Sequence, residues 1–580
     1  MSIALNPFQD RAVHHDGHCT ILACPGSGKT RVLTERAIRI LNQNQQGMLC
    51  AVTFTRDAAD ELKERIAHSS SNLSHRLIVG TFHSVALSQL KNYYRSKLPK
   101  LLSDGQRIAV LKRCWKQHAP ELNFDEDVLP EVDAAKATLK IYEFENPLVK
   151  VVFDSFISVM KSENSMDFSD ILIMTVNLLR NGNISPLQIK WLLVDEGQDM
   201  DEVQQEWISI HGLSNIEVTL VGDDDQSLYA FRNALGYAGL QEITFRLNAT
   251  ESTLPINYRC APNILFHAAK LISKNTNRAP KQIQAFKQNK GSIEVVPAGN
   301  RADEINQIIC AIVKGELKQQ WAILARTNAI LNDVEESIAE QGFKYIRSGG
   351  KSIWEQSLGS MFTSLLKSIA DGNWSGVANT LSFCGLNPSS INQTSITHNT
   401  KSLDEKLATL STLIPEDDEF SKKTIMRLRA GLSSWAQQIK KDRATLVIHG
   451  VNSFLSEFCK PKQAVSIKKM ANTLSLLEGS LSQRLNFIKQ QSTKSDDLLS
   501  PTLIHLLTMH SCKGLEFDNV WIMGLEDPNM PHVDSTEEDE RRLLYVGMTR
   551  AKERLVMSGA LDKGHLSRFI DEAGLGDMLI

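Results

Sequence analysis

The chain has 580 residues, of which 42% are hydrophobic and 23% charged, so we expect a folded protein of several domains and not a disordered or fibrous one. Its 64 Lys and Arg residues almost balance its 67 Asp and Glu residues. The resulting formal charge of -3 excludes a uniformly basic coat for nucleic acid but not a local basic groove. The sequence contains no run of about 18 uninterrupted apolar residues, so we expect no membrane-spanning segment and no membrane partner.

The N-terminal residues and the cysteines indicate a compartment. The opening sequence MSIALNPFQDRAV has neither a basic stretch nor a continuous apolar run, so no secretory signal is predicted. The nine cysteines include no CxxC pair, which argues against a zinc ribbon, and their odd number argues against a disulfide framework. We therefore expect a reduced chain in the cytoplasm.

The first part of the chain alternates between strand-like and helix-like segments. The apolar run Cys19–Ala23 predicts a strand, a Gly-rich turn follows, and apolar residues near helical spacing predict a helix over 30–41. A second predicted strand at 48–54 leads into a predicted helix over 57–67. This order of elements predicts a parallel sheet with crossover helices.

Two long helical stretches interrupt the strand-containing parts of the chain. Residues 86–188 have the pattern of successive amphipathic helices, and so does the Ser-rich and Asn-rich region 369–500, which ends in a polar linker over 490–501. Further strands are expected at 191–194, 218–221, 293–296, 322–324, 504–507 and 520–523. The economical interpretation is two α/β halves, each with a helical insertion.

The turn after the first predicted strand is typical of a phosphate-binding loop. It consists of Ala23, Cys24, Pro25, Gly26, Ser27, Gly28, Lys29 and Thr30. The glycines let backbone amides approach phosphate oxygens, Lys29 would reach the β and γ phosphates, and the Thr30 hydroxyl would bind Mg²⁺. Ala23 stands where the general GxxxxGK[ST] pattern has its first glycine, and a Gly-rich turn without a ligand is the alternative.

Polar side chains also follow two other predicted strands. Asp195 and Glu196 come directly after the strand at 191–194, and Gln226 follows the strand at 218–221. A carboxylate at a strand end can hold Mg²⁺, and its neighbour can polarise a water molecule, although such a pair in isolation is often a solvated turn. Because the carboxyl ends of parallel strands form one crevice, the three strand ends together predict an NTPase.

Short motifs in a fixed order extend this interpretation over most of the chain. They are LNPFQ from residue 5, ACPGSGKT from 23, TFTRDAADEL from 53, GTFHS from 80, DEGQD from 195, VGDDDQSLYAFRNA from 221, NYR from 257, TMHSCKGLEF from 508 and ERRLLYVGMTRA from 540. In kind and order they resemble the motifs of superfamily 1 DNA helicases of the UvrD/Rep/PcrA type.

The resemblance implies an α/β fold with two RecA-like domains, 1A and 2A, which bind ATP between them, and with helical insertions 1B and 2B. The corresponding residues are 1–85 and 189–255 for 1A, 86–188 for 1B, 256–368 and 501–580 for 2A, and 369–500 for 2B. It also implies Mg²⁺-dependent ATP hydrolysis, 3′→5′ movement along single-stranded DNA, and unwinding of duplexes at junctions of single and double strands.

The resemblance assigns roles in hydrolysis to individual residues. Lys29 and Thr30 would hold phosphate and metal, Asp195 would hold Mg²⁺, and Glu196 would be the general base. Further nucleotide contacts are expected from Gln226 at the γ-phosphate or the attacking water, Arg259 and Arg550 as arginine fingers from the second domain, Gln9 at the adenine, Tyr258 near the base, and Gly514 and Glu516 near the ribose.

Single-stranded DNA is expected to contact aromatic and polar side chains of both halves. The candidates are Phe54, Thr81, Phe82, His83, Tyr229, Phe231, Arg232 and His510. Packing in the core is the alternative role for the phenylalanines. The basic stretches 85–118 and 421–443 lie in the expected insertions and could contact either DNA strand or the duplex, or form solvated helix faces.

Two other functions fit the same motifs. The chain could be a helicase-like ATPase subunit of a nuclease or phage-defence complex of the Gabija type, which would activate a partner nuclease or repair protein and not unwind DNA alone. It could also translocate on RNA, against which the DNA-type motifs stand.

Overall fold

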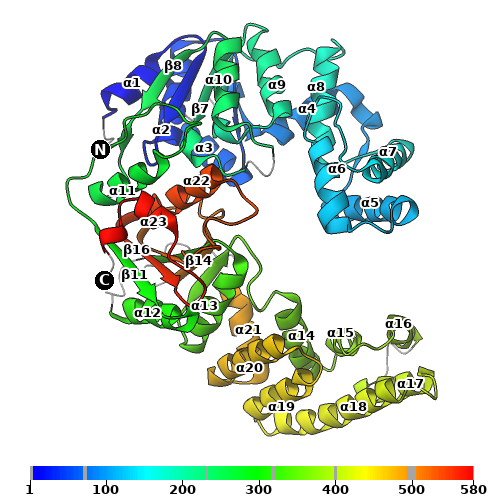
Figure 1. Ribbon diagram of the computed structural model, residues 1–580. Helices are drawn as coiled ribbons and strands as arrows, with labels where there is room; N and C mark the ends of the chain where they lie inside the picture. Colours follow the sequence, from blue (N-terminus) through cyan, green and yellow to red (C-terminus); the bar gives the residue numbers. More distant parts are fainter. Residues whose placement is uncertain are drawn as a thin grey trace. The chain divides into compact units, whose positions relative to one another are not determined.

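Two six-stranded parallel sheets organise the chain (Figure 1). The computed structural model describes residues 4–69, 75–229, 233–314, 320–397, 402–492 and 504–578. By its contacts the chain divides into two units. Unit 1 comprises Met1–Lys290 and Ser535–Thr549, and unit 2 comprises Gly291–Asp534 and Arg550–Ile580. The α/β class with parallel sheets is therefore confirmed.

The sheet of unit 1 has the strand order β3-β2-β6-β7-β1-β8. Its strands are β1 Cys19–Ala23, β2 Leu49–Thr53, β3 Leu77–Thr81, β6 Trp191–Val194, β7 Glu217–Gly222 and β8 Thr250–Leu254. All their pairings are parallel. The four central strands match the predicted ones, whereas the two edge strands, β3 and β8, were not predicted.

Helices cover both faces of this sheet because alternate strand residues point to opposite sides. Ile21 packs in one core with α1 Pro7–His14, α2 Lys29–Gln43 and α3 Arg56–Ser69. Leu22 packs in the opposite core, formed with α4 Phe82–Tyr94, α8 Phe168–Arg180, α9 Glu202–Gly212 and α10 Gly236–Arg246. Unit 1 also contains α11 Pro262–Ile272, α22 Glu537–Met548 and the short pair β9 Ile256–Asn257 and β10 Gln284–Ala285.

The first insertion is helical, as predicted. Besides α4 and α8 it contains α5 Asp104–His118, α6 Leu129–Ala135, α7 Pro147–Ser162 and the two-residue strands β4 Lys100–Leu101 and β5 Ser165–Met166. A small core of its own includes Leu111, Val152 and Phe156.

The sheet of unit 2 has the order β11-β16-β15-β12-β14-β13. Its strands are β11 Ser292–Ala298, β12 Trp321–Ala325, β13 Tyr345–Ser348, β14 Ile504–Thr508, β15 Phe517–Met523 and β16 Ala551–Ala560. Helices α12 Arg301–Lys314 and α13 Asn328–Glu340 pack on it through Ile308, Leu331 and Val334. The short helix α23 Arg568–Glu572 follows the last strand.

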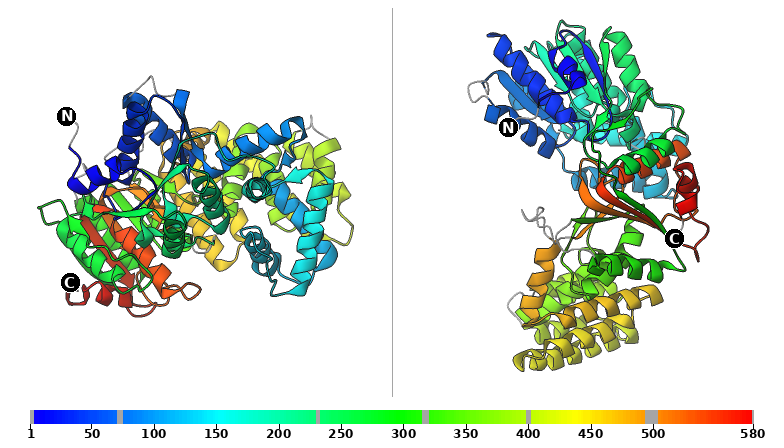
Figure 2. Two further views of the ribbon diagram at one scale, coloured as in Figure 1. Left: turned by 90° about the horizontal axis from the view of Figure 1, so that it is seen from above. Right: turned by 90° about the vertical axis from the view of Figure 1, so that its left-hand side faces the viewer.

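The second insertion is an all-helical bundle. It contains α14 Ser357–Asp371, α15 Ser375–Phe383, α16 Pro388–Thr397, α17 Leu403–Leu413, α18 Glu419–Lys440, α19 Ala444–Ser456, α20 Pro461–Leu476 and α21 Leu481–Ser492. Figures 1 and 2 both show α18, α19 and α20 side by side, around a core that includes Phe362, Leu365 and Leu455. Of the linker predicted over 490–501, residues 493–501 lie outside the described part of the chain.

One feature of the division differs from the sequence prediction. Residues 256–290 and 535–549 were assigned to domain 2A, but by their contacts they belong to unit 1. The four-domain boundaries stay a prediction. Among the described residues, no helix combines the length and the apolar character that crossing a bilayer requires.

Candidate active site

The phosphate loop lies between the end of β1 and the start of α2, as predicted. Gly26 and Gly28 have φ angles of 60° and 84°, a left-handed conformation that favours glycine. A Cβ on Gly26 would lie only 2.6 Å from the Cβ of Arg259, so space as well as conformation requires glycine there. The loop leads into the N-terminus of α2, where unpaired amides and the helix dipole favour an anion.

Gln9 supports this loop from α1. Asn6 caps the helix in a reciprocal capping box, in which the Gln9 side chain accepts a hydrogen bond from the backbone N–H of Asn6 at 3.2 Å. The buried Gln9 donates its Nε2 to the carbonyl of Ser27 at 2.9 Å. Gln9 is therefore fixed beside the phosphate loop, and its contact with an adenine stays a prediction.

The two acidic residues after β6 have different environments. Asp195 is buried and accepts a hydrogen bond from the backbone N–H of Glu196 at 2.9 Å. Glu196 has φ 53°, which is uncommon for a residue with a side chain and costs conformational energy. Its Oε2 lies 3.0 Å from Nζ of Lys29. Burial by itself lowers the pKa of Lys29, but the nearby carboxylates of Glu196, Asp223 and Asp195 outweigh it and raise that pKa.

Gln198 joins this acidic pair to the end of β7. The fully buried Gln198 side chain donates Nε2 to Oε2 of Glu196 at 2.5 Å and accepts the backbone N–H of Asp223 at 2.8 Å. Asp223 in turn accepts a hydrogen bond from Nε2 of Gln226. Gln198 was not among the predicted site residues, although its place inside the DEGQD motif was a signal for it.

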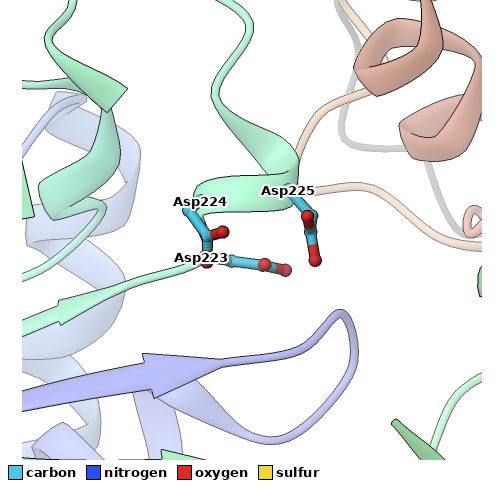
Figure 3. Close-up of side chains that lie close together, drawn as sticks. All are labelled: Asp223, Asp224 and Asp225. Carbon is cyan, nitrogen blue, oxygen red and sulfur yellow. The ribbon is translucent and has the colours of Figure 1, made fainter. Parts of the chain in front are cut away.

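Three consecutive aspartates after β7 form a buried cluster with two cations. Figure 3 shows the side chains of Asp223, Asp224 and Asp225 at the end of the strand and in the short 3₁₀ turn that follows. Their oxygens lie within 4.8 Å of one another, which is close enough for a metal ion. However, Nζ of Lys281 already lies 2.7, 2.7 and 3.1 Å from the three carboxylates, and Arg278 pairs with Asp225 at 2.8 Å. We therefore assign no metal to this cluster.

The NYR motif packs against the phosphate loop within unit 1. Asn257 donates Nδ2 to the carbonyl of Pro25 at 2.7 Å, and the backbone N–H of Tyr258 donates to the carbonyl of Gly26 at 3.0 Å. The hydroxyl of Tyr258 accepts a hydrogen bond from Asn6 at 2.7 Å. Arg259 was expected to arrive from the second domain, but these bonds attach its segment to the loop, and it lies in unit 1.

The remaining predicted nucleotide contacts belong to unit 2. Arg550 is buried and donates Nη1 to the carbonyl of Leu515 at 3.2 Å. Gly514 is exposed with φ 85°, and Glu516 is exposed and pairs with Lys552 at 3.0 Å. Their roles toward a nucleotide stay predictions, and so does the expected DNA contact of the half-buried His510, which also lies in unit 2.

The predicted DNA contacts in unit 1 divide into core and surface residues. Phe82 is only 2% exposed and packs edge-on between Phe54 and Trp207, with ring centroids 6.2 and 5.9 Å away, so it is a core residue with no face for a base. Thr81 caps α4 by accepting the backbone N–H of Ser84. Phe54 and Tyr229 are half-buried, and Phe231 and Arg232 lie outside the described residues.

An exposed aromatic residue that was not predicted lies beside His83. Phe168, at the start of α8, is 52% exposed, and its ring stacks on that of His83 with centroids 3.8 Å apart and planes 17° apart. Burial lowers the pKa of His83 to about 4, so its imidazole is neutral at pH 7. The pair offers an aromatic surface without a positive charge.

Two domain models of UvrD-type helicases match the chain, and several individual proteins are similar to it. Residues 5–237 match the UvrD/REP helicase N-terminal domain, and residues 252–375 and 385–562 match the UvrD-like helicase C-terminal domain. DNA helicase II of Haemophilus influenzae is 28% identical over 639 residues, which cover 96% of this chain and 85% of that protein. The ATP-dependent DNA helicases PcrA of Staphylococcus epidermidis and Staphylococcus aureus are 27% and 26% identical over 621 residues, which cover 96% of this chain and 83% of each relative.

Proposed function

The chain belongs to the UvrD/REP helicase family, and on that premise we propose that it is an ATP-dependent DNA helicase that moves 3′→5′ along single-stranded DNA. The observation that carries the proposal is a continuous polar connection through the site. It runs from Lys29 of the phosphate loop through Glu196 and Gln198 to Asp223 and Gln226. The predicted phosphate ligand, general base and γ-phosphate sensor are thereby held in one hydrogen-bonded network.

Lys29 and Glu196 are proposed to change partners when ATP binds. In the structure, Nζ of Lys29 lies 3.0 Å from Oε2 of Glu196. A triphosphate is the stronger partner for the ammonium, because it carries more charge and lies at the helix N-terminus. Release of Glu196 from the lysine leaves its carboxylate to orient and deprotonate the attacking water.

The oxygen ligands at the site fit Mg²⁺. Thr30 supplies a hydroxyl in the first turn of α2 and Asp195 a buried carboxylate at the end of β6, and both are hard ligands of the kind that magnesium prefers. Thr30 and Asp195 would hold the ion, which neutralises phosphate charge when bound. The backbone bond from Glu196 to Asp195 would keep that carboxylate oriented.

Other residues would complete nucleotide binding. Gln226 would respond to the γ-phosphate or the water, and Arg259, next to Gly26, would neutralise charge that develops on the transferred group. Gln9 and Tyr258, which share Asn6 as a hydrogen-bond partner, would contact the base. Arg550, Gly514 and Glu516 remain proposed contacts from unit 2.

For DNA we propose stacking on aromatic side chains of unit 1. Phe168 joins the proposed contacts, with His83, Phe54 and Tyr229, because an exposed ring already stacked on another offers its free face to a base. Phe82 is left out, because it is buried. Since His83 is neutral at pH 7, it would add stacking and no ionic contact to phosphate.

Two assays on the purified chain test the proposal. We expect ATP hydrolysis stimulated by single-stranded DNA, and unwinding of a duplex with a 3′ tail but not of one with a 5′ tail; Lys29→Ala serves as the inactive control. Hydrolysis without unwinding until a partner nuclease or repair protein is added would favour the subunit role instead. Stimulation by RNA alone would favour an RNA translocase, and no hydrolysis under any condition would refute the proposal.

A further inference from the structure

Lys281 is a buried cation to which the proposed chemistry gives no role. Its side chain is 2% exposed and comes from the polar segment between α11 and β10, far in sequence from the residues it contacts. Burying an ammonium costs several kcal/mol unless charges and hydrogen bonds compensate. Burial by itself lowers the pKa of Lys281, but the carboxylates of Asp223, Asp225 and Asp224 outweigh it and raise that pKa, so the ammonium stays charged.

The ammonium contacts two parts of the nucleotide site at once. Nζ of Lys281 donates to the carbonyl of Ala23 at 3.1 Å, at the end of β1 where the phosphate loop begins. It also donates to Oδ1 of Asp223 at 2.7 Å. Asp223 has a second oxygen, Oδ2, and that oxygen accepts the side-chain amide of Gln226. One side chain therefore joins the start of the phosphate loop to the residue that orients the predicted sensor.

The same aspartate is connected to the predicted general base. The backbone N–H of Asp223 donates to Gln198, whose amide donates to Glu196. If Asp223 moved, its carboxylate would move Gln226. Its backbone N–H would also move Gln198, and through Gln198 it would move Glu196. Displacements of about 1 Å at such positions are enough to slow a reaction about a hundredfold.

We propose that Lys281 is a positioning residue for ATP hydrolysis, which fixes the start of the phosphate loop and the Gln226 sensor relative to each other. The inference rests on the proposed ATPase activity. The ammonium of Lys281 bonds to the Ala23 carbonyl and to the carboxylates of Asp223, Asp224 and Asp225, so it acts on the nucleotide site through Ala23 and Asp223.

Neutralising charge is the competing explanation for this lysine. Three buried carboxylates repel one another, and Arg278 forms an ion pair with Asp225. If charge balance were all that mattered, removing one carboxylate together with the ammonium would restore full function. If position matters, the same pair of changes would restore stability and leave catalysis impaired.

The test compares Lys281→Met with the double variant Lys281→Met and Asp224→Asn in the full chain. The double variant removes one charge of each sign. The backbone nitrogen of Ala279 lies 2.7 Å from Oδ2 of Asp224, and the oxygen of an asparagine at this position can still accept that hydrogen bond. We expect a lowered Tm in the single variant and a Tm near that of the wild type in the double variant. We expect kcat with single-stranded DNA to stay about 10- to 100-fold low in the double variant, with KM for ATP within about threefold. Lys274→Met, an exposed lysine just after α11, is the matched control.

The outcomes separate this inference from the proposed function. A double variant with the kcat of the wild type overturns the positioning role, because charge balance then suffices. A double variant that does not fold also overturns it, because it assigns Lys281 to stability. If the wild type itself hydrolyses no ATP, the proposed function fails and the inference fails with it, whereas an active wild type beside a fully active double variant refutes only the inference.

Discussion

Each of the two sheets ends in a buried cluster of charges, and the two clusters differ in what they contact. In unit 1 the cluster after β7 combines Asp223, Asp224 and Asp225 with Lys281 and Arg278. In unit 2 the cluster after β15 combines Glu304 and Glu526 with Arg301. Both lie at the carboxyl end of an interior strand, the edge where ligands bind in open parallel sheets.

The hydrogen bonds described for the cluster of unit 2 end on the framework of its own sheet. Glu304 accepts the backbone N–H of Gly524 at 3.0 Å and the hydroxyl of Ser558 at 2.6 Å, and Glu526 accepts the backbone N–H of Ala560 at 3.0 Å. These partners follow or belong to β15 and β16. Its charges therefore fasten strands and a helix together.

The cluster of unit 1 extends to residues with proposed chemistry. Lys281 bonds to the carbonyl of Ala23 at the start of the phosphate loop, and Asp223 bonds to Gln226 and, through Gln198, is connected to Glu196. Buried charges thus have two roles in the same type of sheet. In unit 1 they position residues of the proposed site, and in unit 2 they hold strands and a helix together. A buried charge at a strand end therefore does not by itself identify a functional site. The site is identified by the atoms to which that charge is hydrogen-bonded. The difference between the two clusters also predicts which variants lose activity and which lose stability.

The largest effect is expected from Glu196→Gln in unit 1. The amide keeps the size and an acceptor for Lys29 but cannot take a proton, so we expect kcat for ATP to fall at least about 100-fold while ATP binding persists. Steady-state hydrolysis and fluorescent-nucleotide binding measure the two. Glu242→Gln, an exposed residue of α10, is the control. Binding without any loss of turnover would show that another group is the base.

Next in size is Glu304→Gln in unit 2, which tests the other side of the comparison. Loss of the fully buried charge of Glu304 is expected to cost about 3 kcal/mol of unfolding free energy. The Arg301 guanidinium would then be paired with the Glu526 carboxylate alone of the two that compensate its charge. We expect a lower Tm with kcat unchanged at a temperature where the variant is folded. Exposed Glu416→Gln is the control. A kcat that fell with Tm unchanged would remove the distinction between the clusters.

A smaller effect is expected from Phe168→Ala. This substitution tests whether unit 1 binds single-stranded DNA through a surface residue outside its buried charge cluster. Loss of one stacking ring is expected to weaken single-stranded DNA binding by about 1–3 kcal/mol, which is roughly 5- to 150-fold in Kd. Turnover at saturating DNA should change little, since the ring of Phe168 stacks on His83, which has no proposed role in hydrolysis. Fluorescence anisotropy measures the affinity, with Phe245→Ala, an 89% exposed ring of α10, as the control. Equal affinities of both variants would exclude the stacking role.

The sequence was sufficient to predict most of the interior strands, because they are continuous apolar runs, but it missed the interior strand β16, whose first half is charged. Strands β1, β2, β6 and β7 were recognised in this way. Edge strands were recognised less reliably, since β11 was predicted at 293–296 but β3, β8 and β13 were not, and a polar, exposed edge strand lacks an apolar run. The edge strand β8, with the sequence TESTL, is mostly exposed and was missed for that reason.

The site could be predicted only where its residues share a motif or a strand end. Lys29 and Glu196 follow predicted strands of one parallel sheet, and they meet at 3.0 Å as that topology implies. Lys281 has no comparable signal, because it lies in a polar loop and its role depends on carboxylates more than fifty positions earlier in the chain. Phe168 begins an ordinary amphipathic helix, and only its stacking on His83 reveals it.

The smallest effect concerns His83, a half-buried polar group of unit 1 that lies outside the charge cluster. Burial lowers its pKa from the ordinary 6.5 to about 4, so the unfolded chain takes up a proton at a higher pH than the folded chain does. The stability that this difference provides is present above about pH 6.5 and is lost as the pH falls toward 4. His83→Gln should therefore make the fall of Tm between pH 6.5 and 4 less steep, while His75→Gln, at an exposed position, should not. The effect is partial, because burial also lowers the pKa values of His211 and His505 to about 4. Thermal unfolding followed by circular dichroism across this pH range measures it, and parallel curves for His83→Gln and the wild type would show that the imidazole ring does not titrate on unfolding.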